Sequence, residues 1–358
     1  MKERSKRTLI TCAAVLGLLL LGITVTLILR RGDRDASAET VLASGSETAE
    51  SFDSEYWDSE STTAARTKEE TESSESQSSE TGATPEYTLK VTVLNVGQGS
   101  AAVLESSGEY MVIDCGDIDH AQTIVAYLKK VNPEKIKYLC LTHHDLDHVG
   151  GAKGVLLNFP VSEIWIADYE ADTRTYYSLM ETIKNTGIAS LTPKPGRVFT
   201  LGACTVSING PVKAYEEENS NSIAMTITDG TSTVYFGGDA TVESETDTIL
   251  SGYSVDSDVY VCNHHGSSTS SSELFVEALS PRYTIISCDG INGGYGHPTR
   301  KVLNTLKKAG SELYRTDTQG DIIFYFKGEN GMFFEQEPTD NWEPGIFIES
   351  WNTINQAA

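Results

Sequence analysis

The sequence predicts a layered α/β domain, and two observations support this class. Short apolar runs rich in β-branched and aromatic residues alternate with segments of helical periodicity between Thr88 and Phe326. Three of these runs also end directly in His or Asp side chains. Because α/β sheets commonly place their chemistry at strand ends, the same pattern predicts where a site lies.

The expected elements follow in chain order. The predicted strands are residues 88–96, 101–105, 110–114, 136–141, 163–167, 205–208, 223–228, 233–236, 259–262, 283–287 and 322–326. The predicted helices are residues 121–131, 176–186, 272–279 and 299–309. Many strands with interspersed helices are compatible with stacked sheets covered by helices.

The most informative cluster follows the run 136–141. It contains three His and two Asp within six residues: His143, His144, Asp145, Asp147 and His148. Imidazole and carboxylate are the usual protein ligands of zinc, manganese and iron. His144 lies between the other ligands and is expected to point away.

Two further runs end in similar side chains. Asp239 follows the run 233–236, and the pair His264–His265 follows the run 259–262. The three strand ends together predict a metal site. The sequence leaves open which of His264 and His265 binds metal and which faces substrate.

The N-terminal part predicts a membrane anchor. A basic tail, residues 1–7, precedes 22 uncharged residues, 8–29, which would form a helix of about 33 Å, enough to cross a bilayer. The alternative is a cleavable signal peptide with Ala36-Ser37-Ala38 as the cleavage site. The anchor predicts a single-pass protein of the cell membrane with its catalytic domain outside the cytoplasm.

Residues 30–86 form an acidic linker crowded with Ser, Thr and Glu, which predicts disorder because few apolar groups could offset the ordering entropy. A hydrolase domain, residues 87–336, and a C-terminal extension, residues 337–358, follow. Residues 87–358 hold 18 basic and 35 acidic side chains, a net charge of −17. The five Cys of this region form no CxxC pair, so buried thiols are expected rather than a disulfide framework.

Several motifs together resemble a known family. His143-x-Asp145-x-Asp147-His148 resembles the ligand motif of the metallo-β-lactamase fold, with Asp145 in place of the middle His. In order and spacing, the whole set resembles the hydrolase domain of the ComEC competence channel and its stand-alone relatives. The matching motifs are Leu94-Asn95-Val96-Gly97-Gln98-Gly99-Ser100, Val112-Ile113-Asp114-Cys115-Gly116, Asn219-Ser220-Asn221-Ser222, His264-His265-Gly266-Ser267, Tyr295-Gly296-His297-Pro298-Thr299 and Arg315-Thr316-Asp317-Thr318-Gln319-Gly320. This family usually has Asp where this chain has Asn95, and often has Asp where this chain has Ser100.

The resemblance implies a four-layer αββα sandwich and two divalent ions, Zn²⁺ or Mn²⁺, bridged by Asp239. His143 and Asp145 would hold one ion, and Asp147 and His148 the other. The charges agree, because three carboxylates and a hydroxide balance two divalent cations, and near-neutral sites cost least in a partly buried cavity. No His between His148 and His264 can supply the third imidazole that the fold often gives its first ion.

The remaining residues have graded interpretations. Asp147 is expected to be both ligand and proton acceptor, and His297 either protonates a leaving group or holds a phosphate, with a structural His as the alternative. Asp114 is expected to orient the ligand loop, and His120 to lie at the start of a helix. The candidates for supporting the site or contacting the substrate are Gln98, Asn221, Ser222, Ser267 and Arg315. The alternative roles are a tight turn for Gln98, a helix cap for Ser267 and a surface ion pair for Arg315.

These observations predict a membrane-anchored metal hydrolase that uses a metal-activated hydroxide as a phosphodiesterase or nuclease. The resemblance makes DNA the first substrate expected, but an acidic domain repels polyanions at long range. One alternative is a phosphorylcholine-type esterase acting on surface polymers. A second is a non-catalytic binding module with the same fold, although the full ligand set argues against it.

Overall fold

The computed structural model describes residues 87–348, except residue 291. The predicted basic tail, membrane anchor and linker therefore lie outside the described residues, as does Trp351. Within the described part of the chain, no helix is long and apolar enough to cross a membrane.

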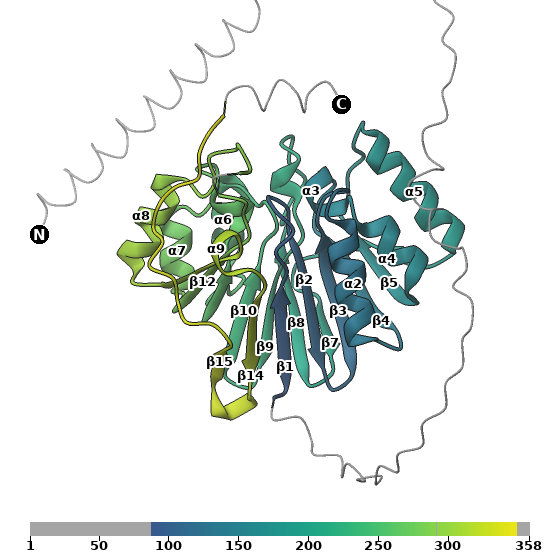
Figure 1. Ribbon diagram of the computed structural model, residues 1–358, viewed down its shortest axis with the longest axis horizontal. Coiled ribbons are helices and arrows are strands. Elements are labelled where there is room, and N and C mark those ends of the chain that lie inside the picture. The colour runs from purple at the N-terminus through teal and green to yellow at the C-terminus, as the bar shows by residue number, and fades with distance from the viewer. Residues whose placement is uncertain (1–86, 291, 349–358) are drawn as a thin grey trace, which may run out of the picture. The chain divides into compact units, whose positions relative to one another are not determined.

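Two sheets form the centre of the domain (Figure 1). The first has the strand order β15-β14-β1-β2-β3-β4-β5-β6, and the second has the order β13-β12-β11-β10-β9-β8-β7. The strands are β1 Leu89–Val93, β2 Ala101–Ser106, β3 Glu109–Cys115, β4 Ile136–Leu141, β5 Val161–Ile166, β6 Ala189–Leu191, β7 Val198–Leu201, β8 Cys204–Gly210, β9 Ala224–Asp229, β10 Ser232–Phe236, β11 Val259–Val261, β12 Tyr283–Ile286, β13 Glu312–Arg315, β14 Ile322–Phe326 and β15 Met332–Phe334.

Helices cover the outer face of each sheet (Figure 1). The helices are α2 Ala121–Val131, α3 Leu146–Val149, α4 Ala152–Asn158, α5 Arg174–Thr186, α6 Val242–Leu250, α7 Glu273–Leu279, α8 Arg300–Ala309 and α9 Thr316–Gln319. One apolar core lies between the sheets, a second lies between the first sheet and α2, α4 and α5, and a third lies between the second sheet and α6–α8. Three stacked cores require four layers, so the predicted mixed α/β sandwich of the metallo-β-lactamase type is confirmed.

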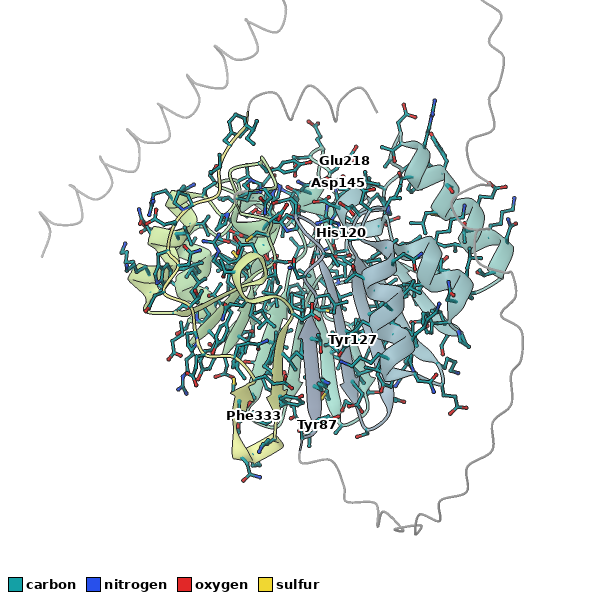
Figure 2. All side chains as sticks on the ribbon, in the orientation of Figure 1. Tyr87, His120, Tyr127, Asp145, Glu218 and Phe333 are labelled. Carbon is teal, nitrogen blue, oxygen red and sulfur yellow. The ribbon has the colours of Figure 1, made fainter. Side chains whose placement is uncertain are left out.

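The strand directions explain why the polar clusters meet. Strands β3, β4, β5 and β6 pair in parallel, and so do β10, β11, β12 and β13. The carboxyl ends of parallel strands lie at one edge of a sheet. His143, Asp239 and His264 follow β4, β10 and β11, so both sheets deliver ligands at the same end of the domain. Figure 2 shows Asp145 at this end and Tyr87 at the opposite end.

The prediction of elements was best for long periodic segments. The predicted helix 121–131 and strand 136–141 match α2 and β4 residue for residue. The first strand is shorter than expected, because it ends at Val93 rather than Val96. The elements that were not predicted are strands β6, β7, β13 and β15 and helices α3, α4, α6 and α9. Each of these strands has only three or four residues, and each of these helices has nine residues or fewer.

The five described Cys are all free and buried, as expected: Cys115, Cys140, Cys204, Cys262 and Cys288. The C-terminal segment up to Ile348 packs back on the domain. Its Trp342 lies against the core under α7 and α8, and the Thr339 amide donates to the Leu313 carbonyl at 2.7 Å.

Candidate metal centre

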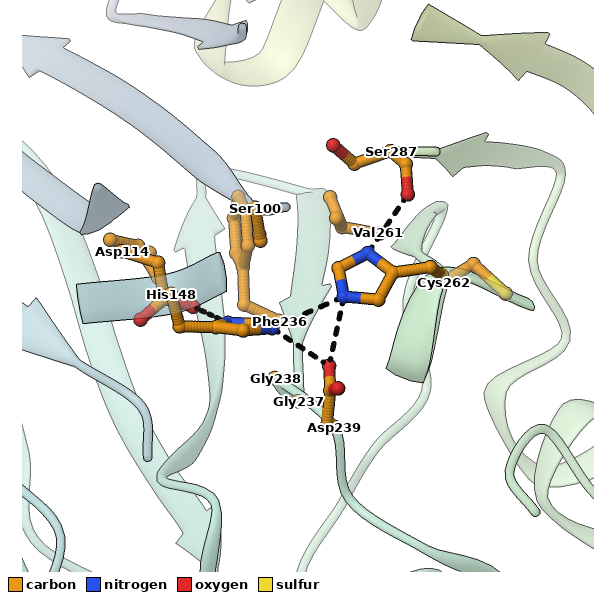
Figure 3. A pocket seen from close by; sticks show the side chains of 12 residues that line it. Ser100, Asp114, His148, Phe236, Gly237, Gly238, Asp239, Val261, Cys262 and Ser287 are labelled. Atoms are coloured by element: carbon orange, nitrogen blue, oxygen red, sulfur yellow. Dashed lines mark hydrogen bonds and ion pairs between the residues drawn. The ribbon is translucent and has the colours of Figure 1, made fainter. Parts of the chain in front are cut away.

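Two groups of ligand-type side chains meet at His148. His143, His148 and Asp239 form one group, and Asp147, His148 and His265 form the other, with the ligand atoms of each group within 4.8 Å of one another. Figure 3 shows Asp114, His148 and Asp239 converging in this pocket. The strand ends singled out from the sequence therefore do come together.

The carboxylate of Asp239 lies between two sets of partners. Its Oδ1 is 3.2 Å from His148 Nε2 and 3.6 Å from His265 Nε2. Its Oδ2 is 3.5 Å from His264 Nε2 and 3.9 Å from His143 Nε2. Each oxygen thus faces its own pair of imidazoles, which is the arrangement that a bridging carboxylate needs.

The two acidic residues of the ligand motif fall on different sides. Asp145 Oδ2 is 3.7 Å from His143 Nε2, and its side chain is 44 % exposed. Asp147 Oδ2 is 3.4 Å from His265 Nε2. His143 and Asp145 therefore lie together, and so do Asp147 and His148, the two pairs that the resemblance implied. His265 lies with the second pair.

The His264–His265 pair owes its geometry to an unusual backbone. Both residues have left-handed backbones, with φ of 53° and 54°. Such conformations cost roughly 1–3 kcal/mol each and persist where the surroundings enforce them. Their effect here is to turn both Nε2 atoms to Asp239, one to each oxygen. Both imidazoles therefore reach the Asp239 carboxylate.

Asp114 positions the ligands without reaching the centre itself. Its Oδ1 accepts from the Thr142 amide and its Oδ2 from the Thr142 hydroxyl, both at 2.8 Å. The same Oδ2 lies 2.8 Å from His148 Nδ1, which leaves Nε2 facing Asp239. A second such contact joins His265 Nδ1 to the Ser287 carbonyl at 2.9 Å. Carboxylate and carbonyl partners of this kind fix the orientation of a ligating imidazole.

The electrostatics of the group favour cations. Burial alone would raise the pKa of Asp239, but His264, His148 and His265 outweigh it, so that pKa lies well below its usual range. Burial would lower the pKa of His148, but Asp239, Asp114 and Asp147 outweigh it and raise that pKa. The carboxylates therefore stay ionised. Protonated imidazoles compensate their negative charge, as bound metal ions would.

Two buried atoms provide a test of whether a metal ion fits. His143 Nε2 and Asp239 Oδ1 are buried, and neither makes a hydrogen bond within the described part of the chain. Buried polar atoms normally have hydrogen-bond partners, and an unsatisfied one indicates a partner from outside the chain, such as an ion. His143 and Asp239 are both of ligand type, and these atoms lie on different sides of the centre, so the residues present fit divalent metal ions.

His297 lies beside this centre rather than in it. Its ring centroid is 5.7 Å from that of His264, and the Gln98 side-chain amide donates to its Nδ1 at 3.1 Å. Gln98 Oε1 accepts from the Asp289 amide, which sets the amide orientation, so the ring proton is assigned to Nε2. Burial, together with His265 and His264, lowers the pKa of His297 to about 3. The ring is therefore a neutral hydrogen-bond donor.

The outer candidates take supporting positions. Ser222 Oγ accepts from the Asp239 amide at 3.1 Å, whereas Asn221 ties its own loop to Tyr215 and Glu217. Ser267 Oγ contacts Thr269, whose hydroxyl is 3.0 Å from His264 Nδ1.

The two remaining His lie away from the centre, as expected. His144 packs against Tyr169 and Tyr176, away from the ligand groups. His120 lies half-buried at the start of α2 and pairs with Asp117.

Arg315 forms an ion pair, but not at the surface. Its side chain is 2 % exposed, and its guanidinium binds Asp317 and two backbone carbonyls. Gln98 lies in the tight turn that was the alternative stated for it, and the Ser100 amide after this turn donates to the Asp147 carbonyl at 3.0 Å.

Sequence reasoning also missed three residues: Thr142, Ser287 and Glu245. Thr142 directly precedes the ligand motif, and Ser287 is the last residue of the strand predicted at 283–287, so a fourth strand end was a usable signal. Glu245 carried none, because α6 contains other acidic residues and nothing in their spacing marks the buried one.

The fold and the site define a metal-binding α/β sandwich, and the chain belongs to the metallo-beta-lactamase superfamily, whose family model matches residues 94–290. Competence protein ComA of Neisseria gonorrhoeae is 29 % identical over 244 residues, 68 % of this chain and 33 % of that protein. ComE operon protein 3 of Bacillus subtilis is 27 % identical over 220 residues, 61 % of this chain and 28 % of that protein. The resemblance to ComEC-related proteins is thereby confirmed.

The chain spans about a third of the length of these curated relatives. Among solved structures, the metallo-beta-lactamase fold protein YhfI of Bacillus subtilis aligns with a TM-score of 0.45 at 16 % identity, over 66 % of this chain and 99 % of that one. His297 lies beyond the residues that the family model matches.

Proposed function

We propose that this chain hydrolyses phosphodiesters with two divalent metal ions, Zn²⁺ or Mn²⁺. The observation that carries the proposal is the position of Asp239, whose two oxygens face separate imidazole pairs. One ion would be held by His143, Asp145 and His264, and the other by Asp147, His148 and His265. On this proposal His264 supplies the third ligand of the first ion.

When bound, such ions supply Lewis acidity that activates an attacking water and offsets charge on the phosphate oxygens. The side chains divide the other tasks. Asp147, at the rim of the second group, is partly exposed and accepts the proton of the attacking water. His297 donates a hydrogen bond from Nε2 to a phosphate or leaving-group oxygen. Asp114 and Ser222 hold His148 and Asp239 in place.

The test is turnover of bis-p-nitrophenyl phosphate by chelator-stripped full-length protein after addition of Mn²⁺ or Zn²⁺. We expect activity only with metal, and a His297→Ala variant, which removes one hydrogen-bond donor, should lose about 10²–10³-fold in turnover while keeping its metal. His120→Ala, which changes a half-buried His outside the centre, is the matched control. A non-catalytic binding module would show no turnover with any metal.

The surface near the site bears on the substrate. Burial raises the pKa of Tyr169, and the carboxylates of Asp145 and Glu218 raise it further, so acidic groups gather where Tyr169 meets the ligand loop. Residues 216–218 are all exposed Glu. An acidic rim opposes a polyanion such as DNA and favours a substrate with a cationic group. A phosphorylcholine-type phosphodiester is therefore the second candidate.

The two substrates respond differently to salt. If the rim selects against DNA, cleavage of a single-stranded oligonucleotide should rise with moderate salt, whereas glycerophosphocholine hydrolysis should stay nearly constant. Loss of oligonucleotide cleavage with added salt would instead indicate binding through basic groups.

We further propose that residues 8–29 anchor the protein in the cell membrane with the catalytic domain on the outer face. The uncharged length of this segment supports the proposal. Protease added to intact cells should remove the domain, and full protection would contradict this orientation.

A further inference from the structure

The last described residues form a strap against the loop that carries His297. This C-terminal strap, residues 341–348, runs antiparallel to the loop Gly293–Pro298. The Gly345 amide donates to the Pro298 carbonyl at 2.9 Å, and the Ile348 amide donates to the Gly294 carbonyl at 2.9 Å. In the other direction, the Gly296 amide donates to Ile346, and Tyr295 forms a β-bridge with Phe347.

The approach is closest at Gly345. A Cβ atom built on Gly345 would lie 2.0 Å from the His297 carbonyl oxygen and 2.6 Å from its carbonyl carbon. Both neighbours are backbone atoms, so no side-chain rotation could make room. Gly at this position is therefore what lets the strap lie on the backbone of His297 itself.

A buried cation fastens the strap to the domain. Arg315 Nη1 donates to the carbonyls of Asn341 and Glu343 at 3.2 and 2.5 Å, and Asp317 holds the other nitrogens at 3.0 and 2.7 Å. Trp342 packs against the core beneath. Figure 1 shows this segment running from β15 along the side of α9 and α8 toward the end of the domain where the site lies. The strap is thus attached firmly enough to define the place of the loop.

We propose that the C-terminal strap is a positioning element of the active site, which holds His297 beside the metal ligands. His297 is then fixed from two sides, by the Gln98 amide on its ring and by Gly345 on its backbone. Both His297 and the strap lie beyond residues 94–290, which the superfamily model matches. The inference rests on the proposed substrate contact of His297.

The first test is a double-variant cycle on full-length, metal-loaded protein. Gly345→Ala should lower kcat for bis-p-nitrophenyl phosphate about 10²-fold with metal content unchanged, because small misplacements of a catalytic group cost about that much. Gly345→Ala combined with His297→Ala should be no slower than His297→Ala alone. Losses that multiply would overturn the proposal, since they would mean that the strap acts independently of His297.

The control is Gly310→Ala at the end of α8. This position has a φ of +78°, and an added Cβ there meets no atom within 4 Å, so the substitution strains the backbone without touching the loop. Activity per folded molecule should equal that of the wild type. A similar loss in this control would assign the effect of Gly345→Ala to general destabilisation and overturn the positioning role.

A second readout does not depend on activity. Hydrogen–deuterium exchange of peptides covering residues 293–299 should speed up in Gly345→Ala, while peptides from β1 to β4 stay unchanged. If Gly345→Ala fails to fold, a chain that ends at Glu343 keeps both Arg315 contacts and removes Gly345. If exchange of residues 293–299 is faster but His297→Ala keeps full activity, only the proposed role of His297 is refuted. Unchanged exchange of these residues in both Gly345→Ala and the shortened chain would refute the positioning role of the strap.

Discussion

The buried carboxylate of Glu245 gives the most quantitative prediction. Glu245 lies on α6 with 1 % of its surface exposed. It accepts hydrogen bonds from the Asn263 side chain at 3.0 Å and from the Ser271 and Ser272 amides at 2.6 and 3.1 Å. These donors flank the left-handed turn that carries the metal-ligand candidates His264 and His265, so Glu245 supports that turn.

Burial raises the pKa of Glu245 from 4.5 to about 7, although the three donors act in the opposite direction. Between these two values the folded protein keeps a proton that the unfolded chain has released. Stability must therefore fall as pH rises from about 4.5, and the loss is complete above about pH 7. A difference of about 2.5 pH units corresponds to roughly 3 kcal/mol at about 1.36 kcal/mol per unit.

The perturbation is Glu245→Gln, which mimics the protonated side chain and cannot ionise. Urea unfolding of metal-free protein at pH 5 and at pH 8 gives four free energies of unfolding. Because pH 5 already lies above 4.5, the difference between variant and wild type should shift by about 2.5 kcal/mol in favour of the variant at pH 8. Other titrating groups cancel, because both proteins carry them. A difference that is the same at both pH values would refute the reasoning.

Three further predictions concern the centre and the domain. Asp239→Ala should abolish nearly all turnover and lower bound metal measured by elemental analysis, and unchanged metal content would contradict a bridging role. Asp114→Asn removes the charge that orients His148 Nδ1 and should reduce metal affinity or activity about 10–100-fold in a competition titration; unaltered affinity would argue against orientation through this contact. A fragment beginning at Tyr87 should unfold cooperatively and bind metal. A broad unfolding transition would mean that the domain boundary is wrong.

The site could be located from sequence because its ligands directly follow apolar strands. His143, Asp239 and His265 each come within a few residues of a buried run, and parallel pairing brings those ends together. The roles of His264 and His265 could not be separated in advance. Neighbouring residues on a regular strand point to opposite faces, and only the left-handed backbone lets both reach Asp239.

Other features depend on packing that no local pattern records. The sequence suggested that Arg315 is a surface cation or contacts substrate. Its burial could not be predicted, because it depends on a strap about thirty residues later. The short strands β6 and β7 are largely exposed, so neither carries the alternation that identifies a half-buried strand. Glu245 likewise becomes notable only when α6 is placed under the His264–His265 turn.

The central claim is that two divalent ions bind on either side of Asp239. Anomalous diffraction from crystals grown with Mn²⁺ tests it most directly. We expect two peaks about 3.5–4 Å apart, one beside each Asp239 oxygen, with His264 next to the first and His265 next to the second. A single peak, or two peaks that do not share Asp239, would contradict the account.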